Sequence, residues 1–180
     1  MSYSLRTATR DDLAEIAEVM RESLRELGRE VYSPRQVASA MEFVGRPDGQ
    51  LIDDGTYFVA VADGAIVGCG GWSRRRKPYA GSAAAADDDE LLDPARDAAH
   101  VRAMFVRATH ARQGIGRAIL ELCEQRAAAD GFRRLQLVAL RSGERMYAAC
   151  GYVAAAEEPV TLKDGVILEC TLMEKTLPRS

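Results

Sequence analysis

Apolar and polar residues recur along the first part of the chain with a period that changes from strand-like to helical. Residues 4–8 form a short run typical of a strand, and apolar positions over 13–27 then repeat at helical spacing until Gly28. Ser33, followed by a proline and by a glutamine three positions on, opens a second helix that we expect to reach about residue 44. Two helices are therefore predicted ahead of the main sheet.

A β-hairpin is the clearest local signal in the chain. Residues 57–62 and 65–72 are two apolar runs, and they are separated by Asp63 and Gly64, a pair suited to a two-residue turn. After the hairpin, residues 73–98 contain a basic run, several alanines and an acidic run, with no stripe that would bury a face. We predict a long surface insertion over about 73–98.

Strands and helices alternate again after the insertion. Residues 100–106 and 135–140 are typical of strands, a helical stripe over 115–127 ends near Gly131, and a short helix is expected over 143–150. The chain shows no internal repeat. The alternating elements predict an α/β (α+β) fold class.

Composition places the chain among ordinary globular proteins. Its 180 residues are 47% hydrophobic and 28% charged, which predicts one domain over 1–180. No run approaches the roughly 20 apolar residues that span a bilayer, and the N-terminus lacks a signal-peptide core, so no membrane contact and a cytoplasmic location are expected. With 24 basic against 27 acidic residues the formal net charge is -3, which gives no footprint for nucleic acid and favours a small-molecule partner.

The four cysteines are widely spaced and form no Cys-x-x-Cys pair. Each sits in an apolar stretch, so the sequence suggests neither a metal site nor a disulfide framework. We predict buried free thiols at Cys69, Cys123, Cys150 and Cys170.

A strand-to-helix turn over residues 107–117 carries the most informative chemistry. Gly114 and Gly116 stand where the helix begins, and the first turn of a helix offers backbone amides without intrahelical acceptors and a partial positive charge. Such a turn is suited to bind a diphosphate. A tight turn without a ligand is the alternative for an isolated Gly-x-Gly.

Two common diphosphate motifs do not fit this turn. A Walker loop ends in Gly-Lys-Ser/Thr, whereas Gly116 is followed by Arg117, so ATP and GTP are disfavoured. A dinucleotide fingerprint needs a third glycine where the chain has Ile119, and the preceding strands form a hairpin instead of a parallel unit. NAD and FAD are disfavoured as well.

The order of elements resembles the GCN5-related N-acetyltransferase (GNAT) family. The matching features are the hairpin, the glycine turn, and the short helix with Tyr147 four residues before Gly151, followed by a closing hairpin. Residues 104–117 are similar to the family's pyrophosphate segment and 135–152 to its second half, and the likeness covers nearly the whole chain. It implies a mixed, mostly antiparallel sheet of about six to seven strands flanked by about four helices, and acetyl-CoA as the acyl donor without a metal.

The resemblance also implies where coenzyme A would lie. Backbone groups of Met104, Phe105 and Val106 would pair with the pantetheine arm. The next segment would hold the pyrophosphate through its backbone amides: Arg112, Gln113, Gly114, Ile115, Gly116 and Arg117. The family's loop usually begins with Gln or Arg where this chain has Ala111, and the cation is shifted to Arg112.

The implied reaction is direct transfer of an acetyl group from acetyl-CoA to a primary amine in a ternary complex. Tyr147 matches the family's proton donor, because a phenol with a pKa near 10 is protonated at neutral pH and can protonate a departing thiolate. The alternative is a core tyrosine. The oxyanion is assigned to a backbone amide near Val106, and the only candidate base is His100, which stays outside the predicted catalytic residues. Leu140 replaces an Asn that the family often carries there.

The acceptor is left open between a small-molecule amine and a protein amine. The acidic run 87–90, with Asp53 and Asp54, would attract a cationic amine if it faced the cleft. A homodimer stays open. Two rival functions are a non-catalytic acyl-CoA-binding sensor or regulatory module, and a nucleic-acid adaptor that uses the basic run 74–77, although a solvated loop is favoured for that run.

Overall fold

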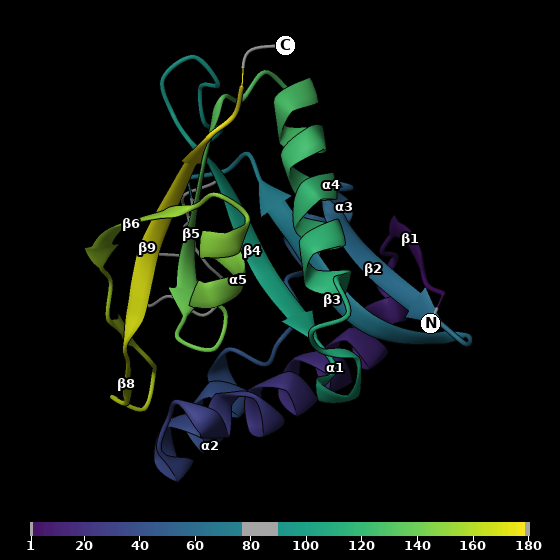
Figure 1. Cartoon of the computed structure of the whole chain (residues 1–180), viewed down its shortest axis with the longest axis vertical. Coiled ribbons are helices and arrows are strands. Elements are labelled where there is room, and N and C mark those ends of the chain that lie inside the picture. The colour runs from purple at the N-terminus through teal and green to yellow at the C-terminus, as the bar shows by residue number, and fades with distance from the viewer. Residues whose placement is uncertain (1, 77–89, 179–180) are drawn as a thin grey trace.

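A computed structural model describes residues 2–76 and 90–178, and its centre is a seven-stranded sheet (Figure 1). The strands lie in the order β1-β2-β3-β4-β5-β9-β6, and the only parallel neighbours among them are β4 and β5. Their bounds are β1 (Ser4–Thr7), β2 (Tyr57–Ala62), β3 (Ala65–Ser73), β4 (Ala99–Val106), β5 (Arg134–Leu140), β6 (Val153–Glu157) and β9 (Cys170–Thr176). A separate small hairpin consists of β7 (Val160–Thr161) and β8 (Ile167–Leu168). The predicted mixed, mostly antiparallel sheet is confirmed.

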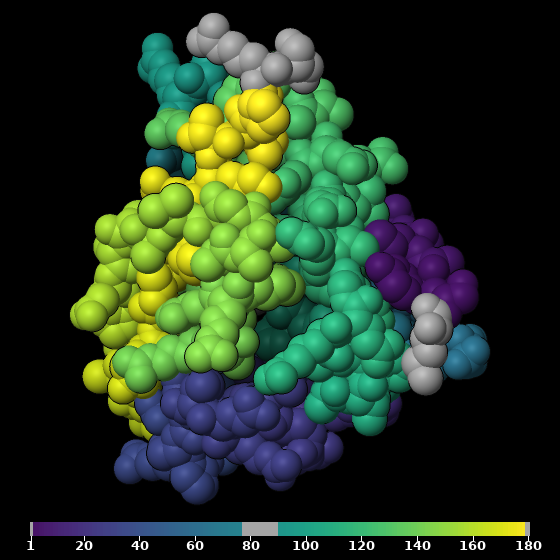
Figure 2. Space-filling view, in the orientation of Figure 1, coloured from purple at the N-terminus to yellow at the C-terminus, as the bar shows by residue number. Residues whose placement is uncertain are grey.

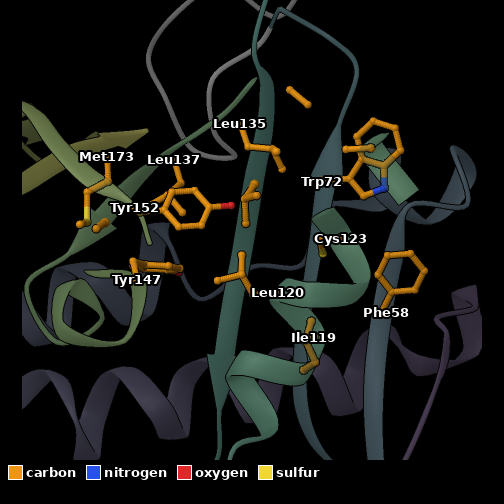
Figure 3. Close-up of a cluster of buried hydrophobic side chains, with 14 of the residues drawn as sticks. Phe58, Trp72, Ile119, Leu120, Cys123, Leu135, Leu137, Tyr147, Tyr152 and Met173 are labelled. Carbon is orange, nitrogen blue, oxygen red and sulfur yellow. The ribbon is translucent and has the colours of Figure 1, made fainter. Parts of the chain in front are cut away.

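Helices cover both faces of this sheet. The α-helices of the described chain are α1 (Leu13–Glu26), α2 (Pro34–Phe43), α3 (Gly49–Asp53), α4 (Ile115–Ala129) and α5 (Glu144–Ala149). Alternate side chains of β2 enter two different cores: Phe58 packs with α4 on one face, and Val59 packs with α1 on the other. Figure 3 shows the first core, in which Trp72 and Phe58 lie on one side of α4 and Tyr147 and Tyr152 on the other.

Local chemistry explains several of these elements. Ser33 Oγ accepts from the Gln36 amide at 3.3 Å while Gln36 Oε1 accepts from the Ser33 amide at 3.0 Å, the predicted reciprocal cap of α2. Asp63 and Gly64 both have positive φ, as a two-residue hairpin turn requires. The helix α3 has no counterpart among the predicted elements, because five residues are too few to show a helical period.

The insertion leaves the sheet at the end opposite to Gly114, because it precedes β4 and the glycine turn follows that strand (Figure 1). The described residues at the two ends of the insertion are hydrogen-bonded to each other beyond the end of β3. The Arg76 amide donates to Glu90 O at 3.0 Å, and the Leu92 amide donates to Arg74 O at 2.8 Å. Leu92 is buried. The described part of the predicted insertion therefore contributes this side chain to the core, and positions 77–89 lie outside the described residues.

The basic run is tied to carboxylates. Three of its arginines form ion pairs: Arg74 with Asp130 at 2.9 Å, Arg75 with Asp54 at 2.8 Å and Arg76 with Glu90 at 2.9 Å. Phosphate binding would have to break these pairs. This geometry favours a structural role over a nucleic-acid surface.

The strands β4 and β5 separate after a short contact. They pair only at Ala99 with Leu135 and His100 with Gln136. Beyond that point β4 contains a bulge, where its register with β3 shifts and Ala103 has a φ of 53°. A bulge bends its strand, so the second half of β4 runs away from β5 and leaves a gap in the sheet.

None of the helices in the described ranges combines the length and the apolarity that crossing a membrane requires.

Candidate active-site cavity

A cavity of about 1020 Å³ opens where β4 and β5 separate. It continues through the sheet, since its lining comes from both cores. Figure 2 shows the hollow between the yellow-green segment around α5, the green segment at the start of α4, and the blue segment of α2. A channel that joins both faces allows two molecules to meet from opposite sides.

The half of the cavity beside α4 and α5, here called the donor half, collects most of the predicted site. It is lined by Met104, Val106, Arg112, Gly114, Ile115, Gly116, Arg117, Met146 and Tyr147. Phe105 also lines the cavity, from the other core. Gln113 does not line it, because its side chain turns back to donate to Thr109 O at 3.2 Å.

The glycine turn has the conformation of an anion nest. Arg112 and Gly114 have φ values of 61° and 85°, and an added Cβ at Gly114 would meet nothing within 4 Å. Where left-handed residues alternate with residues of other conformations, successive backbone N–H groups point toward a common centre. Here that centre lies at the start of α4. The amides are open to a ligand, and the positive φ of Arg112 was not foreseen from the sequence.

Arg107 anchors this turn to the rest of the fold. Its Nε donates to Ile66 O at 2.9 Å on β3, and its guanidinium forms an ion pair with Glu22 of α1. The residue precedes η3 (Ala108–His110), which leads into the nest. Its two partners are far away along the chain, so no local pattern indicates this role.

Tyr147 projects from α5 into the donor half. The side chain is buried and its ring meets that of Tyr152 edge-on, with centroids 6.0 Å apart. Burial raises the pKa of Tyr147 well above its usual range, so the phenol keeps its proton at any physiological pH. Within the described residues the hydroxyl has no hydrogen-bond partner, so it is available to a ligand.

His100 lies away from the cavity. It stands at the start of β4, with Nε2 2.6 Å from Gln136 Nε2, whereas the lining begins at Val101. The donor half is at the other end of the strand, roughly 20 Å from His100 at about 3.3 Å per residue. The structure therefore does not place this candidate base in the site.

The acidic residues expected to attract an amine are committed elsewhere. Asp53 pairs with Arg10 at 2.6 Å and Asp54 with Arg75, and neither aspartate lines the cavity. The residues 87–89 of the acidic run lie outside the described part of the chain.

The other half of the cavity, here called the acceptor half, was not predicted. Its apolar lining comes from α1 and the loop after it, the end of α2, β4, β5 and the β7–β8 hairpin: Leu24, Leu27, Val31, Val44, Phe105, Val138, Leu140, Val160 and Leu162. Glu30, Glu157 and Glu169 also line it, and all three are exposed to solvent. The acceptor half thus has apolar walls and an acidic mouth.

Tyr32 ties three walls of the acceptor half together. Its hydroxyl donates to Glu169 O at 2.7 Å and accepts from the Arg141 amide at 3.1 Å. Gln36 reinforces the joint by donating to Glu169 Oε2 at 2.9 Å. One phenol therefore connects the start of α2, the end of β5 and the segment before β9.

Replacing Tyr32 with phenylalanine should loosen this joint. Two hydrogen bonds are lost and the Arg141 amide loses its partner, at a cost of about 1.5 kcal/mol, which lowers the Tm by about 3–6 °C for a chain of this length. Calorimetry checks this, with Tyr3→Phe as the control. A Tm equal to that of the parent protein would contradict it.

The cysteines are free, and Cys69, Cys123 and Cys170 are buried as predicted. Cys150 is only half-buried, which corrects the expectation for that residue, because it lies at the C-terminal end of α5 near the surface. Burial raises the pKa of Cys69 to about 12 and that of Cys170 to about 11. Within residues 2–76 and 90–178 no group of three or more His, Cys, Asp or Glu side chains is placed to hold a metal ion.

Comparisons with known proteins bear on this site. Residues 17–152 match the sequence model of the acetyltransferase (GNAT) family. A search of curated protein sequences finds no match.

Solved structures share the fold over almost the whole chain. A GCN5-related N-acetyltransferase from Rhodopseudomonas palustris is 22% identical, with a TM-score of 0.75 and coverage of 98% of this chain and 97% of that one. PaiA N-acetyltransferase from Thermoplasma acidophilum, solved with coenzyme A, is 17% identical, with a TM-score of 0.68 and coverages of 98% and 99%. A GNAT superfamily phosphinothricin acetyltransferase from Sinorhizobium meliloti, solved with acetyl-CoA, is 25% identical, with a TM-score of 0.64 and coverages of 98% and 89%.

Proposed function

The chain belongs to the GNAT acetyltransferase family, and from that premise we propose that it transfers an acetyl group from acetyl-CoA to a primary amine. The observation that carries the proposal is the open nest at Gly114 in the same cavity half as the Tyr147 phenol. Two similar structures were solved with coenzyme A or acetyl-CoA bound. Because the lining runs from α1 to β9, we propose that residues 1–180 act as one catalytic domain.

The donor half suits the long, partly anionic coenzyme. The diphosphate would accept hydrogen bonds from the amides of residues 112–117 and lie at the positive end of α4. The edge of β4 after His100 has no strand partner on the β5 side. The amide groups of pantetheine would pair with that edge at Met104, Phe105 and Val106, as an added strand does.

The register of β4 supplies a donor for the oxyanion. The Arg107 amide donates to Val67 O on β3 at 2.9 Å. Consecutive amides of a strand point to opposite edges, so the Val106 N–H points into the gap. It would stabilise the negative charge that develops on the thioester oxygen.

The reaction then needs few protein groups. The neutral amine attacks the thioester carbon, a C–N bond forms, the C–S bond breaks, and coenzyme A leaves as a thiolate. Tyr147 would donate its phenolic proton to that sulfur. The surplus proton on the former amine nitrogen passes to solvent, from which the Tyr147 phenolate would recover a proton after each turnover. Holding the amine against an activated thioester supplies much of the acceleration, because it removes the entropic cost of their encounter.

Ligand-induced stabilisation followed by turnover tests the proposal. Acetyl-CoA and coenzyme A at about 100 times their Kd should stabilise the protein by about 2.7 kcal/mol, a rise in Tm of roughly 5–10 °C. NAD and ATP at the same concentration should produce no rise. Release of free thiol from acetyl-CoA should then depend on an added amine.

Two results would contradict the proposal in different ways. Equal stabilisation by ATP would show that the nest does not distinguish coenzyme A. Tight coenzyme binding without thiol release for any amine would instead favour a non-catalytic sensor.

A further inference from the structure

In the acceptor half, the acidic side chains are exposed to solvent at the opening, and apolar side chains form the walls. Leu24, Leu27 and Phe105 lie inside, while the carboxylates of Glu30 and Glu169 are exposed to solvent. An amine that reaches the thioester must therefore pass an acidic mouth and come to rest between apolar side chains.

We infer that the acceptor is a primary amine with a single positive charge and an apolar body, such as a phenyl ring or an alkyl chain. This inference rests on the proposed acetyl transfer. The acidic mouth would attract the ammonium group, and the apolar walls would then bury the body that follows it.

Arg102 and the apolar walls of the cavity disfavour a second ammonium group. Arg102 lines the cavity with a side chain only 4% exposed, and its guanidinium is paired with Asp48. Glu144, also at the wall, is a carboxylate that accepts from the Thr171 hydroxyl at 2.6 Å and would itself attract a cation, so a second ammonium group is opposed by Arg102 and the apolar walls alone. A polyamine or an aminoglycoside would bring further cations near Arg102 and among apolar walls, where an unpaired charge is costly.

The Glu169 carboxylate at the mouth is stabilised in its charged form. Hydrogen bonds from its own backbone amide and from the Gln36 side chain hold the pKa of Glu169 below its usual range. Two arginines also line this part of the cavity: Arg141, which faces Glu169, and Arg145. The three carboxylates of Glu30, Glu157 and Glu169 outnumber them, so the opening carries a net negative charge.

Val31 is the wall residue best placed to test the inference. It lies in the loop between α1 and α2, lines the acceptor half, and is 39% exposed, so a polar replacement should not disturb the core. Val153 offers a matched control, because it is an exposed valine at 70% on β6 and does not line the cavity.

The first experiment compares acceptors by steady-state thiol release. We expect kcat/KM for 2-phenylethylamine and hexylamine to exceed that for ethanolamine, putrescine and spermidine by about 10-fold or more, the selectivity typical of an apolar pocket. The panel also includes a short peptide with a free N-terminus, which should be acetylated poorly.

The second experiment changes the wall. Val31→Asp should reduce the ratio of kcat/KM for 2-phenylethylamine over putrescine by about 10-fold, since it removes an apolar contact and adds a partner for a second ammonium group. Val153→Asp should leave that ratio unchanged. The rise in Tm on coenzyme A binding verifies that both variants are folded.

The outcomes separate this inference from the proposed function. Rapid acetylation of putrescine, spermidine or the peptide in preference to 2-phenylethylamine would overturn the acceptor class and leave acetyl transfer standing. An unchanged ratio in Val31→Asp would also overturn it. Coenzyme binding without turnover for any amine would overturn acetyl transfer, and the inference with it.

Discussion

Tyr147→Phe is expected to lower kcat about 10²-fold while the Kd for acetyl-CoA changes by less than about twofold. The ring that packs against Tyr152 is retained, so the fold and the coenzyme pocket should persist. Only the hydroxyl that would protonate the departing sulfur is lost, and its contribution is felt in the transition state. General acids contribute about 10²- to 10⁴-fold, and a thiolate is already a fair leaving group, which favours the lower end.

Thiol release in single-turnover experiments gives the rate of the chemical step, and equilibrium titration gives the Kd. Tyr152→Phe is the matched control: this second buried tyrosine touches the first but does not line the cavity, and its variant should retain turnover. A wild-type chemical step in Tyr147→Phe would assign Tyr147 to packing alone.

Gly114→Val is expected to raise the Kd for coenzyme A by about 10- to 100-fold. The residue has a φ of 85°, so a β-branched side chain strains the turn, and the added carbons would stand where the diphosphate meets the amides. Losing one or two hydrogen bonds to a charged group, at about 1.5–3 kcal/mol each, accounts for this range. Arg112→Ala should have a smaller effect, because it removes one side-chain contact and leaves the amides in place.

Gly55→Val separates strain from ligand exclusion. Gly55 has a φ of 69° with nothing within 4 Å of an added Cβ, and it does not line the cavity. Both valine variants should lose stability, but only Gly114→Val should lose coenzyme affinity in isothermal titration. Similar Kd values for Gly114→Val and the parent protein would remove the nest from the coenzyme site.

Signals that act within a few residues were sufficient to predict the elements around the donor half. The cap formed by Ser33 and Gln36, and the turn at Asp63 and Gly64, each involve neighbours along the chain. Gly114 likewise indicates a left-handed turn, because glycine adopts a positive φ more readily than other residues. The resemblance to a family then placed these local features in one arrangement, which the structure shares.

The acceptor half could not be predicted in this way, because distant segments assemble it. Leu27, Val44 and Val160 belong to three separate parts of the chain, and nothing in their local patterns distinguishes a cavity wall from a core. The bulge in β4 is equally hidden, since Ala103 is an unusual residue at positive φ.

The distance of His100 from the donor half could have been predicted from the rise per residue of a β-strand. A residue at the start of β4 and a coenzyme contact at Val106 are six residues apart in an extended chain. At about 3.3 Å per residue, these positions cannot share one reaction centre.

The separation of β4 and β5 also creates two open strand edges inside the molecule. Where two strands part, each presents unpaired N–H and C=O groups, and an open edge is ordinarily a template for another chain. Here both inner edges face one cavity, whose lining includes residues of α1, α4 and α5. Because helices line the same cavity, a thin, flexible chain fits against these edges more easily than a strand of another folded protein.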